Sequence, residues 1–315
     1  MDLQTKIRIP QAKNRLDYSS KSLCLGSCFA GHIGDKLRYY KFQHTVNPFG
    51  VLFHPFAIET LIQRAIQGKF YSKDEFFTDR GLWHHYELHS SLSHPDKNAL
   101  LDTANARLTE TKELLREATH IFITLGTAFT YQYKPTGKLV ANCHKVAQQN
   151  FTKILQSSTD ITQSLTRIKD LIRLLNPQAQ LVFTVSPVRH LKDGFIENQR
   201  SKSHLISAVH EYLDQHKADH YFPSYEVLLD ELRDYRFYGH DMMHPSALAI
   251  DYIWDKFKAT WIEESAFTTM EKVQRIQQGL AHRPFQENSD NHQVFLANLA
   301  AKIDEIQQQH PFIEF

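Results

Sequence analysis

The sequence predicts an α/β protein built on a parallel sheet that is covered by helices on both faces. Residues 121–125 and 181–185 are short, continuously apolar runs, which are typical of strands buried on both sides. Helical periodicity follows each of these runs. Alternation of buried strands with helices along a chain indicates a parallel sheet.

The elements of this sheet are expected in a regular order. Strands are predicted at 23–25, 45–46, 121–125 and 181–185, with a weak strand at 220–222. Helices are predicted after Gly26 to about residue 40, from His54-Pro55 through residue 65, and at 96–118, 161–175 and 199–216, with a last one from about Ser246. Proline supports two of these boundaries, because it opens one helix at Pro55 and ends another at Asn176-Pro177.

Three further segments depart from the alternation. Residues 76–88 and 129–140 are predicted to be hairpins, with turns at 79–81 and 135–137. Beyond about residue 260, two Gln-rich helical segments at 263–280 and 291–309 flank a polar break at 284–290. We therefore expect a domain over 1–260 and a C-terminal helical extension over 261–315. The extension either packs on the core or forms a homodimer contact.

Composition narrows the classes of function. The 36 Lys and Arg residues nearly balance the 35 Asp and Glu residues, which argues against a nucleic-acid partner bound through a broad basic face. No run approaches the roughly 20 apolar residues of a membrane span, so no membrane partner is expected. Residues 1–21 lack the apolar core of a secretory signal. Cys24, Cys28 and Cys143 are too few for a disulfide framework or a zinc site, so we expect a cytoplasmic protein without metal or cofactor.

Small and polar residues follow every predicted strand. They lie at 26–28, 47–50, 126–127 and 186–190, and in the loop before Ser246. In open parallel sheets, ligands bind beyond the carboxyl ends of the strands. The sequence therefore predicts an enzyme with its site at this edge.

Ser27 and Cys28 follow the first strand directly, at a strand-to-helix turn. Such a turn exposes a side chain, and the helix N-terminus would lower the pKa of a cysteine and increase its thiolate fraction. A serine there would need a histidine base. The alternative is that Ser27 only caps the helix and Cys28 packs in the core.

Asp241 and His244 are candidates for the other half of such a site. Pro245 disfavours the helical conformation at His244, which places this histidine in a loop just before a helix. The three-residue spacing lets the Asp241 carboxylate reach one imidazole nitrogen and leaves the other for a nucleophile. The alternative is a surface loop in which both residues are incidental.

Two other polar residues are candidate substrate ligands. Arg189 follows the strand at 181–185 together with His190, and could bind a carboxylate or phosphate of the substrate. The alternative for Arg189 is a surface salt bridge. His144 could orient the site or hydrogen-bond substrate, or it could be a structural histidine.

Two segments resemble a known family. Residues 25–30 (Leu-Gly-Ser-Cys-Phe-Ala) and 241–245 (Asp-Met-Met-His-Pro) resemble the GSCFA family, which is itself similar to the SGNH, or GDSL-like, hydrolases. Residues 142–145 and 186–188 also look like family segments. The resemblance implies a flavodoxin-like three-layer sandwich, a nucleophile in the first segment, a glycine after the second strand, an asparagine after the third, and an Asp-x-x-His pair.

The resemblance assigns further residues and leaves one choice open. Gly50 corresponds to the glycine whose backbone N–H would face an oxyanion. The third block carries Thr127 in a sequence that lacks the usual asparagine, so Asn142 is the candidate replacement, with a plain turn residue as the alternative. Alignment on Gly26 selects Cys28 as nucleophile and alignment on serine selects Ser27. The register of the following helix favours Cys28.

Together these features predict an esterase-like hydrolase. It would act on a small-molecule or glycan acyl ester through a covalent acyl-enzyme, with Cys28 or Ser27 as nucleophile, His244 as base and Asp241 as its orienter. An acyltransferase on the same fold is the first alternative. A non-catalytic protein that binds a glycan or acyl ligand is the second.

Overall fold

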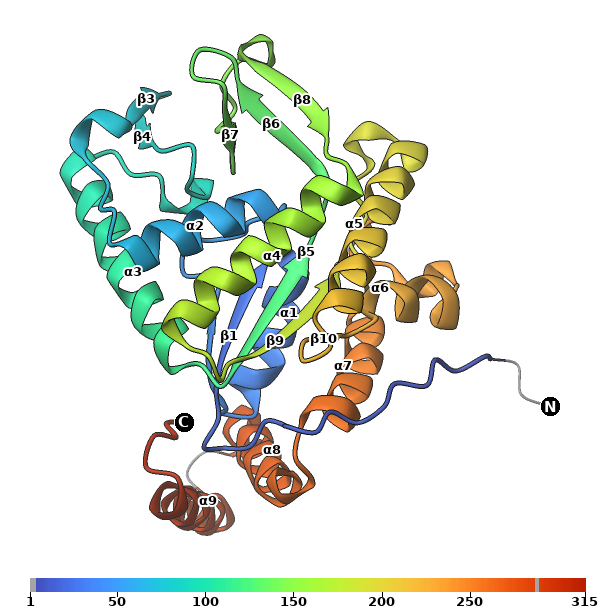
Figure 1. The fold of residues 1–315 in the computed structure, drawn as a ribbon. Helices are drawn as coiled ribbons and strands as arrows, with labels where there is room; N and C mark the ends of the chain where they lie inside the picture. The colour runs from blue at the N-terminus through green and yellow to red at the C-terminus, as the bar shows by residue number, and fades with distance from the viewer. Residues whose placement is uncertain (1–3, 287–288) are drawn as a thin grey trace.

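The computed structural model describes residues 4–286 and 289–315, and its centre is a parallel sheet of five strands (Figure 1). The strands are β1 (Lys21–Gly26), β2 (Gln43–Val46), β5 (His120–Leu125), β9 (Gln180–Val185) and β10 (His220–Tyr221). Their order across the sheet is β10-β9-β5-β1-β2, and every pair is parallel. This is the 2-1-3-4-5 order of flavodoxin-like sheets, so the predicted fold class is confirmed.

Helices cover both faces of this sheet. One face carries α2 (Pro55–Gln67), α3 (Lys97–Glu117), α4 (Ser158–Leu175) and α5 (Phe195–Gln215), and the other carries α1 (Cys28–Tyr39) and α7 (Ala247–Trp261). Alternate residues of β1 point to opposite faces of the sheet. Leu23 and Leu25 pack in the core under α2 to α5, and Cys24 packs in the core under α1 and α7. This two-sided burial explains why the strands are continuously apolar.

Two excursions interrupt the alternation of strands and helices, one between α2 and α3 and the other after β5. The first is an antiparallel hairpin of β3 (Phe77–Asp79) and β4 (Leu82–His84). The second is a three-stranded sheet of β6 (Phe129–Tyr133), β7 (Lys138–Val140) and β8 (Phe151–Leu155), in the order β7-β6-β8 (Figure 1). Both predicted hairpins are confirmed. β8 was not predicted, because it is a mostly half-buried edge strand without a continuous apolar run.

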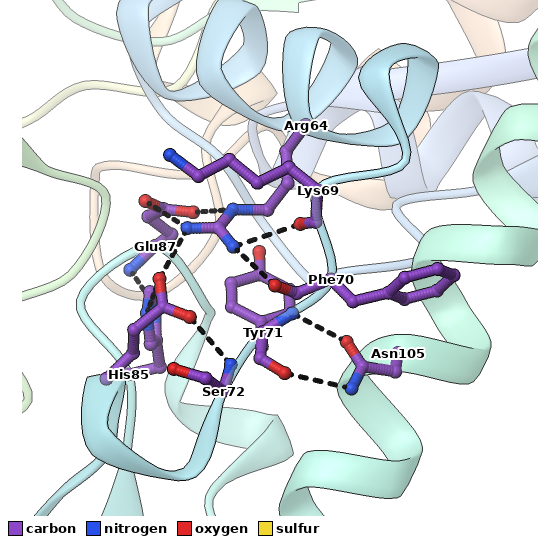
Figure 2. Close-up of polar contacts among 9 residues, drawn as sticks. Arg64, Lys69, Phe70, Tyr71, Ser72, His85, Glu87 and Asn105 are labelled. Atoms are coloured by element: carbon purple, nitrogen blue, oxygen red, sulfur yellow. Dashed lines mark hydrogen bonds and ion pairs between the residues drawn. The ribbon is translucent and has the colours of Figure 1, made fainter.

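Figure 2 shows how the first excursion is tied to α2 through Arg64. Arg64 is buried, and its guanidinium bonds Glu75 at 2.8 Å and Glu87 at 2.9 Å. The guanidinium also lies 4.1 Å from the ring centre of Tyr71. Breaking a buried pair leaves a charge uncompensated, so this network holds the hairpin and the turn after it in one position.

The remaining helical segments are short turns and two C-terminal helices. They are η1 (Lys73–Glu75), η2 (Ser90–Leu92), η3 (Gln148–Asn150), η4 (Leu191–Asp193), α6 (Ser224–Glu226), the π-helical η5 (Val227–Leu232), η6 (Tyr235–Phe237), η7 (Glu264–Ala266), α8 (Phe267–Ala281) and α9 (Asp290–Gln309). Within residues 4–286 and 289–315, no helix combines the length and the apolar character that crossing a bilayer requires.

The two C-terminal helices share the core of the α1 and α7 layer. Met270 and Val273 of α8 and Ile306 of α9 are buried in the same hydrophobic cluster as α1 and α7. Packing on the core, one of the two expected arrangements, is therefore what the structure has. Two residues of the predicted polar break at 284–290, 287 and 288, lie outside the described part of the chain.

A buried lysine joins the ends of two central strands. Lys202 of α5 is 1% exposed, and its Nζ donates hydrogen bonds of 2.7 Å to the carbonyls of Gly126, after β5, and of Ser186, after β9. Burial lowers the pKa of Lys202 to about 7. Lys202 thus links the ends of β5 and β9 at the sheet edge where the predicted site lies.

The depressed pKa of Lys202 predicts a dependence of stability on pH. Between about pH 7 and pH 10, the unfolded chain binds a proton that the folded chain has released, so the free energy of unfolding rises with pH. The slope from this group is at most about 1.4 kcal/mol per pH unit. In Lys202→Met this component disappears, so the variant loses more stability relative to wild type at pH 9.5 than at pH 6.5.

Urea unfolding at several pH values measures this difference. The exposed Lys217, which pairs with Asp214, supplies the control Lys217→Met, whose deficit stays constant over the same range. Parallel pH profiles of wild type and Lys202→Met would contradict a depressed pKa at Lys202.

Gly26 ends β1 at a point where no side chain fits. Its φ is +128°, and a Cβ there would lie 2.0 Å from the carbonyl oxygen of Thr124 on the paired strand β5. Both the conformation and the close approach require glycine. Only a glycine at position 26 therefore lets the chain turn from β1 into α1 while it packs against β5.

Replacement of Gly26 by alanine should be strongly destabilising. We expect Gly26→Ala to lose about 2–5 kcal/mol in the free energy of unfolding, because strain and overpacking act together. Gly31, in α1, meets nothing within 4 Å of an added Cβ, so Gly31→Ala should instead gain about 0.5–1 kcal/mol. Chemical denaturation of both variants tests the pair. A Gly26→Ala protein as stable as wild type would refute the steric argument.

Candidate active site

Ser27 is the N-cap of α1 and is shielded from solvent. Its Oγ accepts a hydrogen bond of 3.3 Å from the backbone N–H of Phe29, and its own N–H donates to the carbonyl of Thr124 at 3.0 Å. The residue is 1% exposed. Ser27 therefore satisfies an orphan donor at the start of the helix, which is the capping alternative considered from the sequence.

Cys28 is the first residue of α1 and faces a cavity. The cavity has a volume of about 520 Å³, and both Cys28 and His244 line it. Ser27 does not line it. Among the described residues, neither Ser27 nor Cys28 forms a hydrogen bond with His244, so the structure brings Cys28 and His244 to one cavity without joining them.

The expectation of a lowered pKa at Cys28 is wrong. Burial raises the pKa of the Cys28 thiol, and the opposing effect of its own backbone N–H is smaller. The helix N-terminus was expected to dominate, but desolvation of the thiolate outweighs it. A nucleophilic Cys28 would therefore start as a thiol and depend on a base.

Asp241 and His244 form a tightly bonded pair. The Nδ1–H of His244 donates to Oδ2 of Asp241 at 2.6 Å. The other carboxylate oxygen, Oδ1, accepts the backbone N–H groups of Met243 at 2.9 Å and His244 at 3.0 Å. These bonds hold the pKa of Asp241 well below its ordinary value. The arrangement leaves Nε2 of His244 as the nitrogen that can accept a proton.

The loop around this pair has a defined backbone conformation. Met242 adopts a φ of +57°, which lets the chain turn between Asp241 and His244. The N–H of Gly239 donates to the carbonyl of His244 at 2.8 Å, and the N–H of Arg189 donates to the carbonyl of Met243 at 3.1 Å. The loop that carries His244 is thus attached to the segment that follows β9.

Asn142 lines the same cavity, and a hydrogen bond orients its side-chain amide. Its Oδ1 accepts the backbone N–H of His144 at 2.8 Å. Its own N–H and that of Ala141 donate to the carbonyl of Tyr86 at 3.2 Å and 2.8 Å. Because Oδ1 is occupied, the amide nitrogen Nδ2 is left as a donor. No other group in the described ranges accepts a hydrogen bond from it.

His54, which was predicted only as the start of a helix, also fixes this region. It is buried, its Nδ1 accepts the N–H of Ala57 at 3.1 Å, and its Nε2 donates to the carbonyl of Val140 at 3.1 Å. Burial lowers the pKa of His54 to about 4, so the ring is neutral at pH 7. Its place as N-cap before Pro55 marked it as a helix start, but the contact with β7 depends on the tertiary structure.

Gly50 does not have the predicted role of oxyanion donor. Its N–H donates to the carbonyl of Asn47 at 2.7 Å, inside the turn that follows β2, and it does not line the cavity. The glycine is needed for another reason. Its φ is +75°, and an added Cβ would lie 2.4 Å from the Cβ of His89.

Thr127 lines the cavity, but its polar groups are occupied. Its N–H donates to the carbonyl of Phe53 at 3.0 Å, and its Oγ1 accepts the N–H of Phe129 at 3.0 Å. The same hydroxyl lies 3.0 Å from Oγ of Ser201. Its contribution here is to the start of β6.

His144 has the structural role that was the alternative to a substrate contact. It is buried, its Nε2 donates to the carbonyl of His85 at 2.8 Å, and it does not line the cavity. Its ring lies 4.7 Å from that of His84. Burial lowers the pKa of His144 to about 4. The ring therefore links the first excursion to the turn that presents Asn142.

His190 and Arg189 lie where the sequence placed them, just after β9, and both line the cavity. The Nε2 of His190 is buried and has no hydrogen-bond partner in the described part of the chain. Burial and the nearby Lys202 lower the pKa of His190 to about 4, so this ring is uncharged at neutral pH. Arg189 forms no salt bridge with any described acidic residue, in contrast to the surface pairing considered from the sequence.

The cavity was also searched for side chains that could share a metal ion. Over residues 4–286 and 289–315, no three His, Cys, Asp or Glu side chains converge as metal ligands. The chemistry available here is that of a thiol, a histidine–carboxylate pair, a fixed amide donor and one backbone N–H at the start of α1.

Comparison with known proteins places the chain in a family. No match was found among curated proteins. Among solved structures, the acetyl xylan esterase Est2A from the rumen bacterium Butyrivibrio proteoclasticus is similar at 12% identity with a TM-score of 0.36. That alignment covers 78% of this chain and 65% of the esterase chain, which is just under two thirds of its length. The model of the GSCFA domain protein, C-terminal domain, matches residues 273–315. The GSCFA family model matches residues 21–257, and the protein is therefore a member of the GSCFA family.

Proposed function

We propose that the protein is a cysteine-dependent hydrolase of acyl esters, with an SGNH-like arrangement of its active site. The observation that carries this proposal is that Cys28 shares a cavity with His244, which is bonded to Asp241, whereas Ser27 is buried as a helix cap. The raised pKa of Cys28 supports a mechanism in which a base must act. His244 has the free nitrogen that such a base requires.

The reaction proceeds in two halves. His244 takes the proton from the Cys28 thiol through Nε2 as the sulfur attacks the ester carbonyl, and Asp241 stabilises the imidazolium that forms. The tetrahedral intermediate collapses by breaking the carbon–oxygen bond, and His244 returns the proton to the departing alcohol. Water then attacks the thioester with His244 again as base, which releases the acid and restores the thiol.

We assign two donors to the oxyanion. The backbone N–H of Cys28 lies at the N-terminus of α1, where helical N–H groups have no partner inside the helix. The amide nitrogen of Asn142 is the second donor, because the bond from His144 to its Oδ1 fixes its orientation. This pair replaces the glycine and the third-block asparagine that the SGNH resemblance implied.

Substitution at Cys28 and Ser27 separates a nucleophile from a cap. We expect Cys28→Ala to lower kcat on p-nitrophenyl acetate by a factor on the order of 10³ or more. Ser27→Ala should keep most of the activity and lose about 1 kcal/mol in the free energy of unfolding, because it removes an N-cap. Acyl adducts are located by mass spectrometry of the quenched enzyme. An adduct on Ser27, or an active Cys28→Ala protein, would contradict the assignment.

Asn142→Ala tests the oxyanion donor. We expect kcat to fall by a factor on the order of 10²–10³ with a smaller change in KM, because the bond forms mainly in the transition state. Gln148 carries another amide on the wall of the same cavity, so Gln148→Ala is the matched control and should lie within threefold of wild type. A kcat for Asn142→Ala close to that of Gln148→Ala would remove Asn142 from the oxyanion site.

A further inference from the structure

Arg189 lies at the border of two cavities. It lines the cavity that contains Cys28 and His244, and also a neighbouring cavity of about 310 Å³. Its guanidinium carbon lies 3.9 Å from the ring centre of Tyr238, 5.5 Å from that of Tyr235 and 5.8 Å from that of Phe195. Three aromatic rings therefore hold the guanidinium at the junction.

Most of the hydrogen-bonding capacity of Arg189 is unused. The guanidinium has five N–H donors, and its one bond to a described residue is a long one of 3.4 Å to the carbonyl of Met242. Other partly buried arginines of this chain are paired: Arg15 with Glu263, Arg64 with Glu75 and Glu87, and Arg173 with Asp219. Arg189 is thus positioned like a structural arginine but lacks an acidic partner among the described residues.

The second cavity presents further donors. The Oδ1 of Asn198 accepts the backbone N–H of His190 at 2.8 Å, and the Oε1 of Gln199 accepts the hydroxyl of Tyr225 at 2.7 Å. Both amides line the cavity with their oxygens occupied, so their nitrogens remain as donors. Together with Arg189, they form a set of donors that requires an acceptor, and a carboxylate or phosphate supplies several acceptor oxygens.

The charge of the first cavity agrees with this requirement. Its lining includes the cations Arg189, Lys153 and Lys192 and one carboxylate, Asp193, which pairs with Lys153. His190 does not add a charge at neutral pH. Cations therefore outnumber carboxylates around the space in which a substrate would lie, and the field favours an anionic ligand.

We propose that Arg189, with the amide nitrogens of Asn198 and Gln199, binds an anionic group of the substrate. The ester cleaved at Cys28 then carries a carboxylate or a phosphate that reaches the second cavity. Phe195 and Ile196, which also line that cavity, contact the apolar part next to the anion. The binding of an anion stands on the donor set alone, whereas its link to an ester rests on the proposed function.

Two esters of equal length test the proposal. The p-nitrophenyl monoester of glutaric acid carries a terminal carboxylate, and p-nitrophenyl valerate is its neutral counterpart. Wild type should hydrolyse the anionic ester with a kcat/KM at least tenfold higher. In Arg189→Met this preference should fall by tenfold or more, and Arg189→Lys should restore it only in part, because a lysine lacks the planar fork. Arg236→Met, at an exposed arginine paired with Asp234, is the control and should keep the preference.

The same variants separate anion binding from a purely structural role. If Arg189 only held the His244 loop through Met242, both esters would slow by the same factor in Arg189→Met, and that result would overturn the proposal. A wild-type protein with equal kcat/KM for the anionic and the neutral ester would also overturn it.

Binding measurements separate this proposal from the esterase itself. Calorimetric titration with glutarate and with glycerol phosphate identifies which anion the site takes. Should no ester be hydrolysed, binding of either anion by wild type and its loss in Arg189→Met would still support the anion site while rejecting the esterase. If wild type binds neither glutarate nor glycerol phosphate and shows no preference for the anionic ester, the anion site is rejected.

Discussion

The contact between Gly26 and the carbonyl of Thr124 is the constraint on which the site depends. It allows β1 to turn into α1 directly against β5, so that Ser27 caps the helix and Cys28 emerges into the cavity. Gly26 is further held by a hydrogen bond of 2.8 Å from its N–H to Oδ1 of Asn47. A side chain at this position would separate two central strands and displace the turn that presents the thiol.

The other components are supplied by segments outside the sheet and are positioned by buried polar contacts. Asn142 is held by the carbonyl of Tyr86, just after the first excursion, and by the N–H of His144. That excursion is tied to α2 through Arg64. His244 is held by Asp241 and by the backbone of Arg189. The sheet fixes Cys28, and ion pairs and buried histidines fix the segments around it, so the geometry of the site depends on several regions of the chain.

The pattern of apolar residues was sufficient to predict the strands and helices of the central domain. The strands are buried on two faces and are therefore continuously apolar, and the helices show helical periodicity. It was insufficient for β8, whose mostly half-buried residues pair at an edge. The pKa of Cys28 is raised, whereas the sequence predicted that it would be lowered. A helix N-terminus is visible in a sequence, but the extent of desolvation depends on residues from several elements that surround the thiol.

What the sequence contained on its own is the fold class, the edge of the sheet where polar residues gather, and the pairing of Asp241 with His244. These are local or periodic features, and three residues of separation suffice to set the last of them. The burial of Ser27, the engagement of the Gly50 N–H inside its turn and the hydrogen bond to the Asn142 side chain appear only in the tertiary structure. Whether a polar group is free or occupied depends on its neighbours in space, and at the Ser27–Cys28 turn this left the cysteine lining the cavity that His244 also lines.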